Sequence, residues 1–209
     1  MNIVVVDIGI GNIRSVANAL SYLKADYCLT DKPKIIEKSK YLILPGVGSF
    51  DGVMNALEKK KLIMSIKAHI NEKKKPFLGI CVGMQILMKK SEEGKKEGLN
   101  IFSEKLEKLE FRPSNKENKV PNVGFSAIFG YRQEGLFKDF KDTENFYFTH
   151  SYALKKVRKI EGINLAYCEH NSKFISALNY KNVSAVQFHP EKSQSIGLKL
   201  ISNFLEAYI

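Results

Sequence analysis

The sequence predicts an α/β fold, a three-layer sandwich in which helices cover both faces of a mixed, mostly parallel central sheet. In the first half of the 209 residues, short β-branched runs alternate with longer amphipathic segments, the pattern of a parallel sheet with crossover helices. After about residue 99, short apolar runs are separated by polar turns without a long helix, which indicates an antiparallel extension of the sheet.

The first half supplies the predicted parallel strands and their helices. Residues 3–7 form a buried strand, and the turn at residues 9–12 leads into a helix to about residue 23, because Val16, Leu20 and Leu23 recur at helical spacing. The other predicted strands are residues 27–29, 41–44 and 76–80, and the other predicted helices are residues 62–70 and 84–88.

The second half is predicted to add short strands and one closing helix. The strands are residues 106–111, 146–149, 165–169, 175–180 and 183–187, and the helix covers about residues 197–208. The most loop-like stretch, residues 113–118, is too short for a domain boundary. The length therefore predicts one domain over residues 1–209.

Composition narrows the class of protein. Hydrophobic residues make up 44% and charged residues 26%, which predicts a folded globular chain. No apolar run approaches the ~18 residues that cross a bilayer, and the chain begins with a strand-like run, so a cytoplasmic protein without membrane contact is expected. The three cysteines lack metal-ligand spacing, so neither a disulfide framework nor a metal is predicted, and no cofactor motif appears.

The net charge of +11 does not have the pattern of a nucleic-acid site. The lysines occur in short runs at the ends of predicted helices, where they complement the helix dipole and solvate the surface. We therefore expect no nucleic-acid partner. The runs are residues 59–61, 73–75, 89–90 and 95–96.

The segment Gly79-Ile80-Cys81-Val82-Gly83 is the strongest chemical signal. It joins a predicted strand to a predicted helix, and its glycines leave room for a tight turn that presents Cys81 as a nucleophile. The positive end of the following helix would favour the reactive thiolate. A buried structural cysteine is the alternative; Cys28 and Cys168 lack such neighbours and are interpreted as packing residues.

A cysteine nucleophile needs a proton carrier, and His189 is the best candidate. It follows the predicted strand 183–187, and Glu191 stands two residues on, where a carboxylate can orient the imidazole. His150 ends another strand, so it is also able to approach the site. His69 is expected to be solvated in a lysine-rich helix, and His170 to lie in a turn.

Leu44-Pro45-Gly46-Val47-Gly48 ends another predicted strand. Its glycines allow backbone amides to turn toward a ligand, which suits an oxyanion hole formed together with the amide of Val82. A plain turn is the alternative. All three motifs lie at strand ends, where an open α/β sheet binds its ligands.

Together these motifs resemble those of the class I, triad-type glutamine amidotransferases, and the resemblance covers nearly the whole chain. It implies a flavodoxin-like fold. Most members have Pro-Gly-Gly where this chain has Pro-Gly-Val-Gly, which points to the histidine-pathway branch. The motifs are Asp7-Ile8-Gly9-Ile10-Gly11-Asn12, Pro45-Gly46-Val47-Gly48-Ser49-Phe50, Gly79-Ile80-Cys81-Val82-Gly83-Met84-Gln85, Tyr147-Phe148-Thr149-His150-Ser151-Tyr152 and Gln187-Phe188-His189-Pro190-Glu191-Lys192-Ser193.

The resemblance implies glutamine hydrolysis. Cys81 would attack the carboxamide, His189 would carry the proton to departing ammonia, and Glu191 would orient His189. Val47 would supply an oxyanion amide after a peptide flip signalled by the partner. The residues implied to hold glutamine are Gly48, Gln85, Glu93, Ser151 and Tyr152.

The resemblance also implies a heterodimer with a (β/α)8-barrel cyclase. That partner would receive the ammonia and make imidazole glycerol phosphate and the purine-pathway intermediate AICAR in histidine biosynthesis. Asn12, Asn122 and Phe125 would lie at the interface. The segment Pro121-Asn122-Val123-Gly124-Phe125-Ser126 departs from the Pro-His-Met-Gly-Trp-Asn usual in the family, which bears on which synthase docks.

Three alternatives stay open. A paralogous glutaminase would feed ammonia to a different synthase, such as one that modifies a surface-polysaccharide or nonulosonic-acid sugar. A peptidase or deglycase-like cysteine hydrolase uses a similar elbow, but the His-Pro-Glu placement and the Pro-Gly-Val-Gly loop disfavour it. A non-enzymatic subunit would be expected to lack part of the triad, which is complete here.

Overall fold

Twelve strands of the described residues form one sheet in the computed structural model, which describes residues 3–9, 12–111 and 119–207. The strands of the first half and one strand from the end of the chain are all parallel. In spatial order this parallel part consists of β2 (Tyr27–Thr30), β1 (Ile3–Val6), β3 (Tyr41–Gly46), β4 (Phe77–Cys81) and β12 (Val183–Val186).

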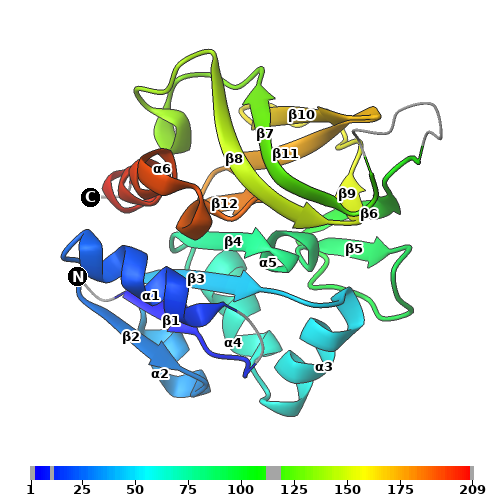
Figure 1. Ribbon diagram of the computed structural model, residues 1–209. Coiled ribbons are helices and arrows are strands. Elements are labelled where there is room, and N and C mark those ends of the chain that lie inside the picture. The colour runs from blue at the N-terminus through cyan, green and yellow to red at the C-terminus, as the bar shows by residue number, and fades with distance from the viewer. Residues whose placement is uncertain (1–2, 10–11, 112–118, 208–209) are drawn as a thin grey trace.

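Beyond β12 the sheet continues with antiparallel strands, so the predicted mixed sheet is confirmed. Figure 1 shows the parallel part below and the antiparallel part above it. This part runs through β11 (Ser172–Tyr180), β10 (Asn164–His170), β7 (Asn122–Phe129) and β8 (Thr143–His150). A branch from β11 contains β9 (Tyr152–Leu154), β6 (Phe102–Lys108) and β5 (Met88–Ser91), the last of which pairs with β6 in parallel.

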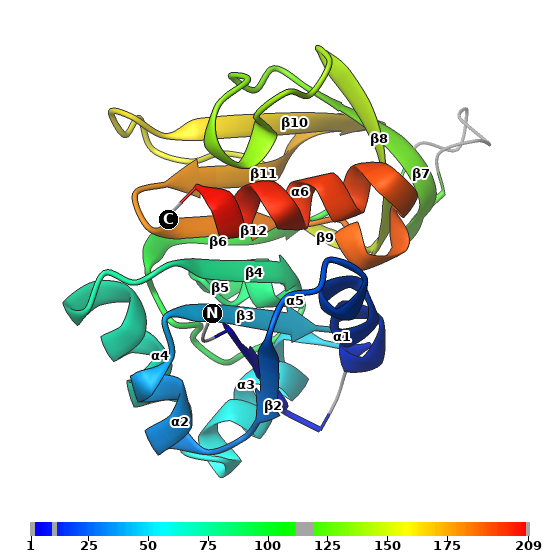
Figure 2. The ribbon, with the colours of Figure 1, turned by 90° about the vertical axis from the view of Figure 1, so that its left-hand side faces the viewer.

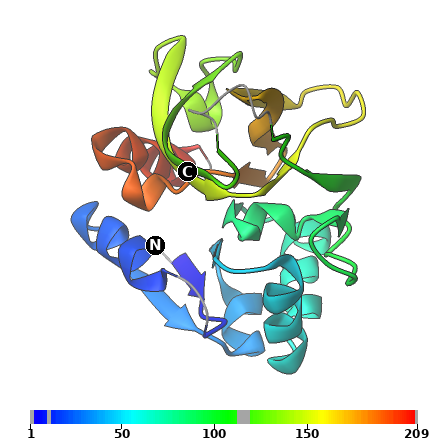
Figure 3. The ribbon, with the colours of Figure 1, turned by 45° about the vertical axis from the view of Figure 1, so that its right-hand side comes forward.

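Helices lie on both faces of the parallel strands (Figures 2 and 3). One face carries α1 (Ile13–Tyr22) and the closing helix α6 (Gln194–Glu206). The other carries α2 (Pro33–Lys38), α3 (Phe50–Lys59) and α4 (Ile63–Lys67), which continues as a π-helical turn at Ala68–Glu72. No helix among the described residues is long and apolar enough to span a membrane.

Local sequence explains where these elements begin. All four residues of β1 and all five of β4 are buried, as expected for strands covered on both faces. The helix α3 starts after Ser49, whose side chain accepts a hydrogen bond from the Gly52 amide at 3.2 Å. Pro33 occupies the first turn of α2, where its missing N–H costs no hydrogen bond.

A cluster of aromatic rings fixes the chain just before His189. Phe188 is fully buried, with its ring centroid 4.0 Å from that of Phe146 and 5.6 Å from that of Phe148. The backbone amide of His189 donates to the Tyr147 carbonyl at 2.8 Å. Rings packed at these distances on both sides leave the segment little freedom, so His189 is held by the core and not by a loose loop.

The structure corrects two of the predicted elements. The predicted helix 84–88 is the single turn α5 (Val82–Gln85), and Met88 instead begins β5. A short continuous apolar run fits a buried helix or a buried strand equally well, so its pattern did not separate the two. The strand predicted at 106–111 lies earlier, in β6, and the loop predicted at 113–118 falls outside the described residues.

Candidate active site

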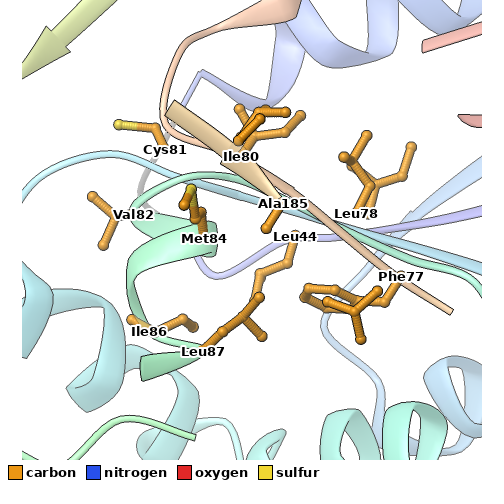
Figure 4. Packing of buried hydrophobic residues seen from close by; sticks show 14 of the residues in the cluster. Leu44, Phe77, Leu78, Ile80, Cys81, Val82, Met84, Ile86, Leu87 and Ala185 are labelled. Carbon is orange, nitrogen blue, oxygen red and sulfur yellow. The ribbon is translucent and has the colours of Figure 1, made fainter. Parts of the chain in front are cut away.

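The tight strand-to-helix turn predicted at Cys81 is present in the structure. Cys81 ends β4 and precedes α5 with φ +54° and ψ −111°, a conformation that costs a non-glycine residue on the order of 1–3 kcal/mol. In Figure 4 its sulfur points away from the apolar side chains of Leu78 and Ile80. The strain thus accompanies a buried thiol at the edge of the core, where it lines a cavity.

Glycines around Cys81 are required because backbones approach closely there. A Cβ atom on Gly83 would lie 1.9 Å from the Leu44 carbonyl oxygen, and one on Gly79 would lie 2.6 Å from the Gly83 oxygen. Gly46, on the neighbouring strand β3, would bring a Cβ to 2.8 Å from the Gly83 amide. The turn therefore excludes larger residues at all three positions.

His189 and Cys81 meet because their strands are neighbours. β12 pairs in parallel with β4, with Val186 opposite Ile80, so the residues after both strands emerge at the same edge of the sheet. His189 Nδ1 lies 2.7 Å from Glu191 Oε1, and both side chains are 1% exposed. Because the carboxylate accepts, Nδ1 carries the proton; within the described residues His189 Nε2 has no hydrogen-bond partner.

The electrostatics favour a charged His189. Burial by itself lowers the pKa of His189, but the interactions with Cys81 and Glu191 outweigh it and raise this pKa to about 9. The imidazole is therefore protonated at neutral pH, and a cation of this kind stabilises a neighbouring thiolate. The expected helix dipole contributes little, because α5 is only one turn long.

Cys81 and His189 open into a cavity of about 300 Å³. The residues predicted for the oxyanion hole, Val47 and Val82, both line it. All the residues predicted to hold glutamine line it as well. Glu191 does not line the cavity and contacts the Nδ1 side of His189. The full lining is Val47, Gly48, Cys81, Val82, Gln85, Glu93, Pro121, Thr149, His150, Ser151, Tyr152 and His189.

Two lining side chains are held in fixed orientations. Glu93 Oε2 accepts the backbone amide of Phe50 at 2.7 Å, at the start of α3, which leaves the other carboxylate oxygen for a ligand. Gln85 donates from Nε2 to the Tyr152 carbonyl and to Gln187 Oε1, each at 3.0 Å. The cavity thus presents preoriented polar groups beside the thiol.

His150 lines the cavity in its neutral form. Burial lowers the pKa of His150 to about 4, against a smaller opposite effect of its hydrogen bond to Tyr152. Nδ1 donates to the Tyr152 carbonyl at 3.0 Å, so Nε2 accepts from the Asn122 amide nitrogen at 3.4 Å. His150 is therefore a neutral, fixed part of the cavity wall, and His189 is the charged imidazole at the cavity.

The structure places several residues in surroundings that the sequence did not indicate. Asn122, expected at a partner interface, is 3% exposed and faces His150. His69, expected in solvent, is fully buried and bonded to Ser39 and to the Pro76 carbonyl. Cys28, interpreted as a packing residue, is exposed, whereas Cys168 is buried as predicted. The local pattern carried no information about which neighbours would cover these residues.

One site residue was missed. Gln187 is fully buried and donates from Nε2 to Cys81 Sγ at 3.7 Å. A polar residue that directly follows the buried strand β12 was the available signal, because a buried amide requires partners. Phe125, in contrast, is 52% exposed on β7, and Asn12 is half-buried at the start of α1.

Comparisons with known proteins agree with this geometry. Residues 4–207 match the family model "Glutamine amidotransferase class-I". The chain is 41% identical over 203 residues to the HisH subunit of imidazole glycerol phosphate synthase from Caldanaerobacter subterraneus, covering 97% of this chain and 96% of that protein. It is 37% identical over 204 residues to the HisH 2 subunit from Methanococcus maripaludis, covering 98% of each.

Solved structures have the same fold. One described as glutamine amidotransferase superposes with a TM-score of 0.73 at 20% identity, covering 98% of each chain. Another, described as PurLQS from Thermotoga maritima, gives a TM-score of 0.67 at 20% identity, covering 98% of this chain and 97% of that one. The flavodoxin-like, class I architecture expected from the sequence is thereby confirmed.

Proposed function

Because the chain belongs to the class-I glutamine amidotransferase family, we propose that it is the glutaminase subunit of imidazole glycerol phosphate synthase. It hydrolyses glutamine to glutamate and ammonia for histidine biosynthesis. The family model and the full-length similarity to HisH subunits support this activity. The observation that carries the proposal is the buried His189–Glu191 pair at the same sheet edge as the strained Cys81.

In the first half of the reaction, the Cys81 thiolate attacks the carboxamide carbon of glutamine. The carbonyl oxygen takes up negative charge, and the backbone amides of Val47 and Val82, both at the cavity wall, donate to it. His189 Nε2 gives its proton to the departing nitrogen, the C–N bond breaks, and ammonia leaves. A γ-glutamyl thioester remains on Cys81, and His189 is neutral.

In the second half, water attacks the thioester. His189 Nε2 accepts one proton from this water and the C–S bond breaks, which returns the thiolate. The new carboxylic acid gives its remaining proton to solvent and leaves as glutamate. Glu191 keeps the proton on Nδ1 throughout, so Nε2 is always the nitrogen that faces the reaction. The imidazolium and thiolate needed for the next cycle are thereby restored.

The cavity suits a small amino acid. Its volume of about 300 Å³ is at the lower end of ligand pockets, which fits a substrate of the size of glutamine. We assign the glutamine to Gly48, Gln85 and Glu93, with the backbone of Ser151 and Tyr152. Glu93 supplies a carboxylate for the α-ammonium group, and the site requires neither a metal nor a cofactor for this chemistry.

For the partner we propose a (β/α)8-barrel cyclase that binds at the mouth of the cavity. Val123 and Phe125 are 57% and 52% exposed on β7, and Pro121 of the same segment lines the cavity. Asn12 follows β1 at the same edge of the sheet. These residues would surround the passage of ammonia in a heterodimer, and the complex would work in the cytoplasm.

The chain itself is proposed to fold as one domain. A single hydrophobic cluster contains residues from the parallel part, such as Val5 and Leu78, and from the antiparallel part, such as Phe148 and Phe174. One continuous core of this kind leaves no apolar seam along which two domains would separate.

Glutamate release tests this function. The purified chain is assayed with glutamine alone and then with the cyclase of its own organism and the ribulosyl substrate of that enzyme. We expect slow turnover alone and stimulation of at least about a hundredfold in the complex, since one oxyanion-hole donor, here the Val47 amide that the partner would turn toward the site, contributes about 10²–10³ in kcat. Turnover that depends on Cys81 without stimulation would assign the chain to a different synthase, and the absence of turnover in both assays would refute the glutaminase.

A further inference from the structure

We propose that Gln187 is a positioning residue that holds the sulfur of Cys81 through an amide N–H, an inference that rests on the proposed function of Cys81 as nucleophile. Gln187 Nε2 lies 3.7 Å from Cys81 Sγ, within the range of hydrogen bonds to sulfur. Gln187 is fully buried and is not part of the cavity lining, so it reaches the reaction only through Cys81.

The orientation of the Gln187 amide follows from its other contacts. The Tyr152 carbonyl only accepts, so Gln85 turns Nε2 toward it at 3.0 Å. The same nitrogen also faces Gln187, whose oxygen is the atom able to accept, again at 3.0 Å. Nε2 of Gln187 is therefore directed at the sulfur.

The opposite orientation of Gln187 is excluded by chemistry. A rotated amide would set two N–H donors against each other at Gln85 and turn an oxygen lone pair toward Cys81 Sγ. The Tyr152 carbonyl is also fixed in place, because it accepts the His150 Nδ1 proton at 3.0 Å. In each hydrogen bond of the series from Tyr152 through Gln85 and Gln187 to Cys81, the donor and the acceptor are therefore fixed.

The donor suits the charged state of the nucleophile. A thiol can donate weakly to the Thr149 carbonyl, 4.0 Å from Sγ, but a thiolate has no proton to donate and needs donors around it. Gln187 supplies one from the side of β12, where a buried amide without a partner would be costly. Gln187 therefore offers the reacting sulfur a hydrogen-bond donor and helps to orient it.

Gln85 acquires a second role from the same contacts. Besides lining the glutamine cavity, it fixes which end of Gln187 faces the nucleophile. The occupancy of the cavity and the environment of the sulfur are thereby linked through one side chain.

The test is alkylation of Cys81 by iodoacetamide at pH 7, measured by peptide mass spectrometry on the full chain without glutamine. The variants are Gln187→Glu, which replaces the donor with an acceptor, and Gln187→Met, which is similar in length and has no donor. Exposed Cys28 serves as an internal reference, because its alkylation rate should not change. Asn203→Asp is the matched control, since Asn203 is also a buried amide and donates only to the Leu136 and Lys138 carbonyls.

We expect Cys81 alkylation to slow about tenfold in both Gln187 variants, as for the loss of one hydrogen bond to a charged group, and to stay unchanged in Asn203→Asp. In the glutaminase assay, kcat should fall by a similar factor while KM changes less than about twofold. Unchanged Cys81 alkylation in folded Gln187→Met would overturn the proposal, whether or not Gln187→Glu folds. Alkylation is measured without turnover. A parent chain that is alkylated normally but does not hydrolyse glutamine would therefore contradict the glutaminase function and not the role of Gln187.

Discussion

Glu191 Oε1 lies 2.7 Å from His189 Nδ1, in a pair whose two side chains are each 1% exposed. This contact determines which imidazole nitrogen carries a fixed proton and which one faces Cys81. Because the pair is buried, neither solvent nor a neighbouring side chain replaces the carboxylate when it is lost.

Glu191→Gln should therefore lower kcat for glutamine hydrolysis by about two to four orders of magnitude, since a carboxamide permits the wrong tautomer of His189. KM for glutamine should change little, because Glu191 does not line the cavity. Steady-state kinetics measure both. A kcat within about threefold of the parent chain would contradict the orienting role.

The raised pKa of His189 predicts that stability depends on pH. The folded-state pKa of about 9 exceeds the ordinary value of 6.5, so the stabilising contribution is complete below pH 6.5 and disappears as the pH rises through 9. The expected loss is on the order of 3 kcal/mol at most, from about 1.4 kcal/mol for each pH unit.

Urea unfolding between pH 6 and pH 10 measures this loss. His189→Gln is the matched variant, because it keeps a polar side chain that does not titrate. Its stability should change less over this range than that of the parent chain. Parallel curves for the two proteins would show that His189 is not the titrating group.

Gly83→Ala should prevent correct formation of the elbow. Its Cβ would lie 1.9 Å from the Leu44 carbonyl oxygen, so α5 or β3 has to move, and we expect a loss of at least about 3 kcal/mol. Gly162→Ala is the control: Gly162 has φ +81° and no heavy atom within 4 Å of the added Cβ. That variant should cost only about 1 kcal/mol for backbone strain. Thermal unfolding compares them, and equal losses would refute the steric argument.

Glu93→Gln should raise KM for glutamine. One Glu93 oxygen is held by the Phe50 amide, and we assign the other to the substrate ammonium group. Losing this charge at a desolvated contact should raise KM by about ten- to a hundredfold. Alkylation of Cys81 by iodoacetamide should remain normal, because Glu93 makes no contact with the sulfur among its described hydrogen bonds. Slower alkylation would instead indicate a general disturbance of the site.

Phe125→Ser should weaken binding of the cyclase about ten- to a hundredfold, the range for a central aromatic residue in an interface. Phe125 is 52% exposed, so its loss should cost the isolated chain little stability. Tyr22→Ser is the control, since Tyr22 is 74% exposed at the far end of α1. Isothermal titration calorimetry measures both affinities; equal affinities would place the interface elsewhere.

Much of the site was predictable because its requirements are local. A tight strand-to-helix turn needs small residues next to the nucleophile, and this requirement is visible at Gly79 and Gly83. A carboxylate two residues after His189 is also a local pattern. The resemblance to the amidotransferases then added the cavity residues, and all of those predicted to hold glutamine do line the cavity.

The sequence by itself thus predicted most of the strands and the tight turn at Cys81, and it pointed to His189 and Glu191, since these features depend on neighbours a few residues apart. Only the tertiary structure decided that β12 lies beside β4, which brings His189 to Cys81, and that Asn122 and His69 are buried. It alone revealed the contact from Gln187 to the sulfur. Strand order, burial and hydrogen-bond partners arise from segments distant in the chain, and no local pattern of residue types encodes those distances.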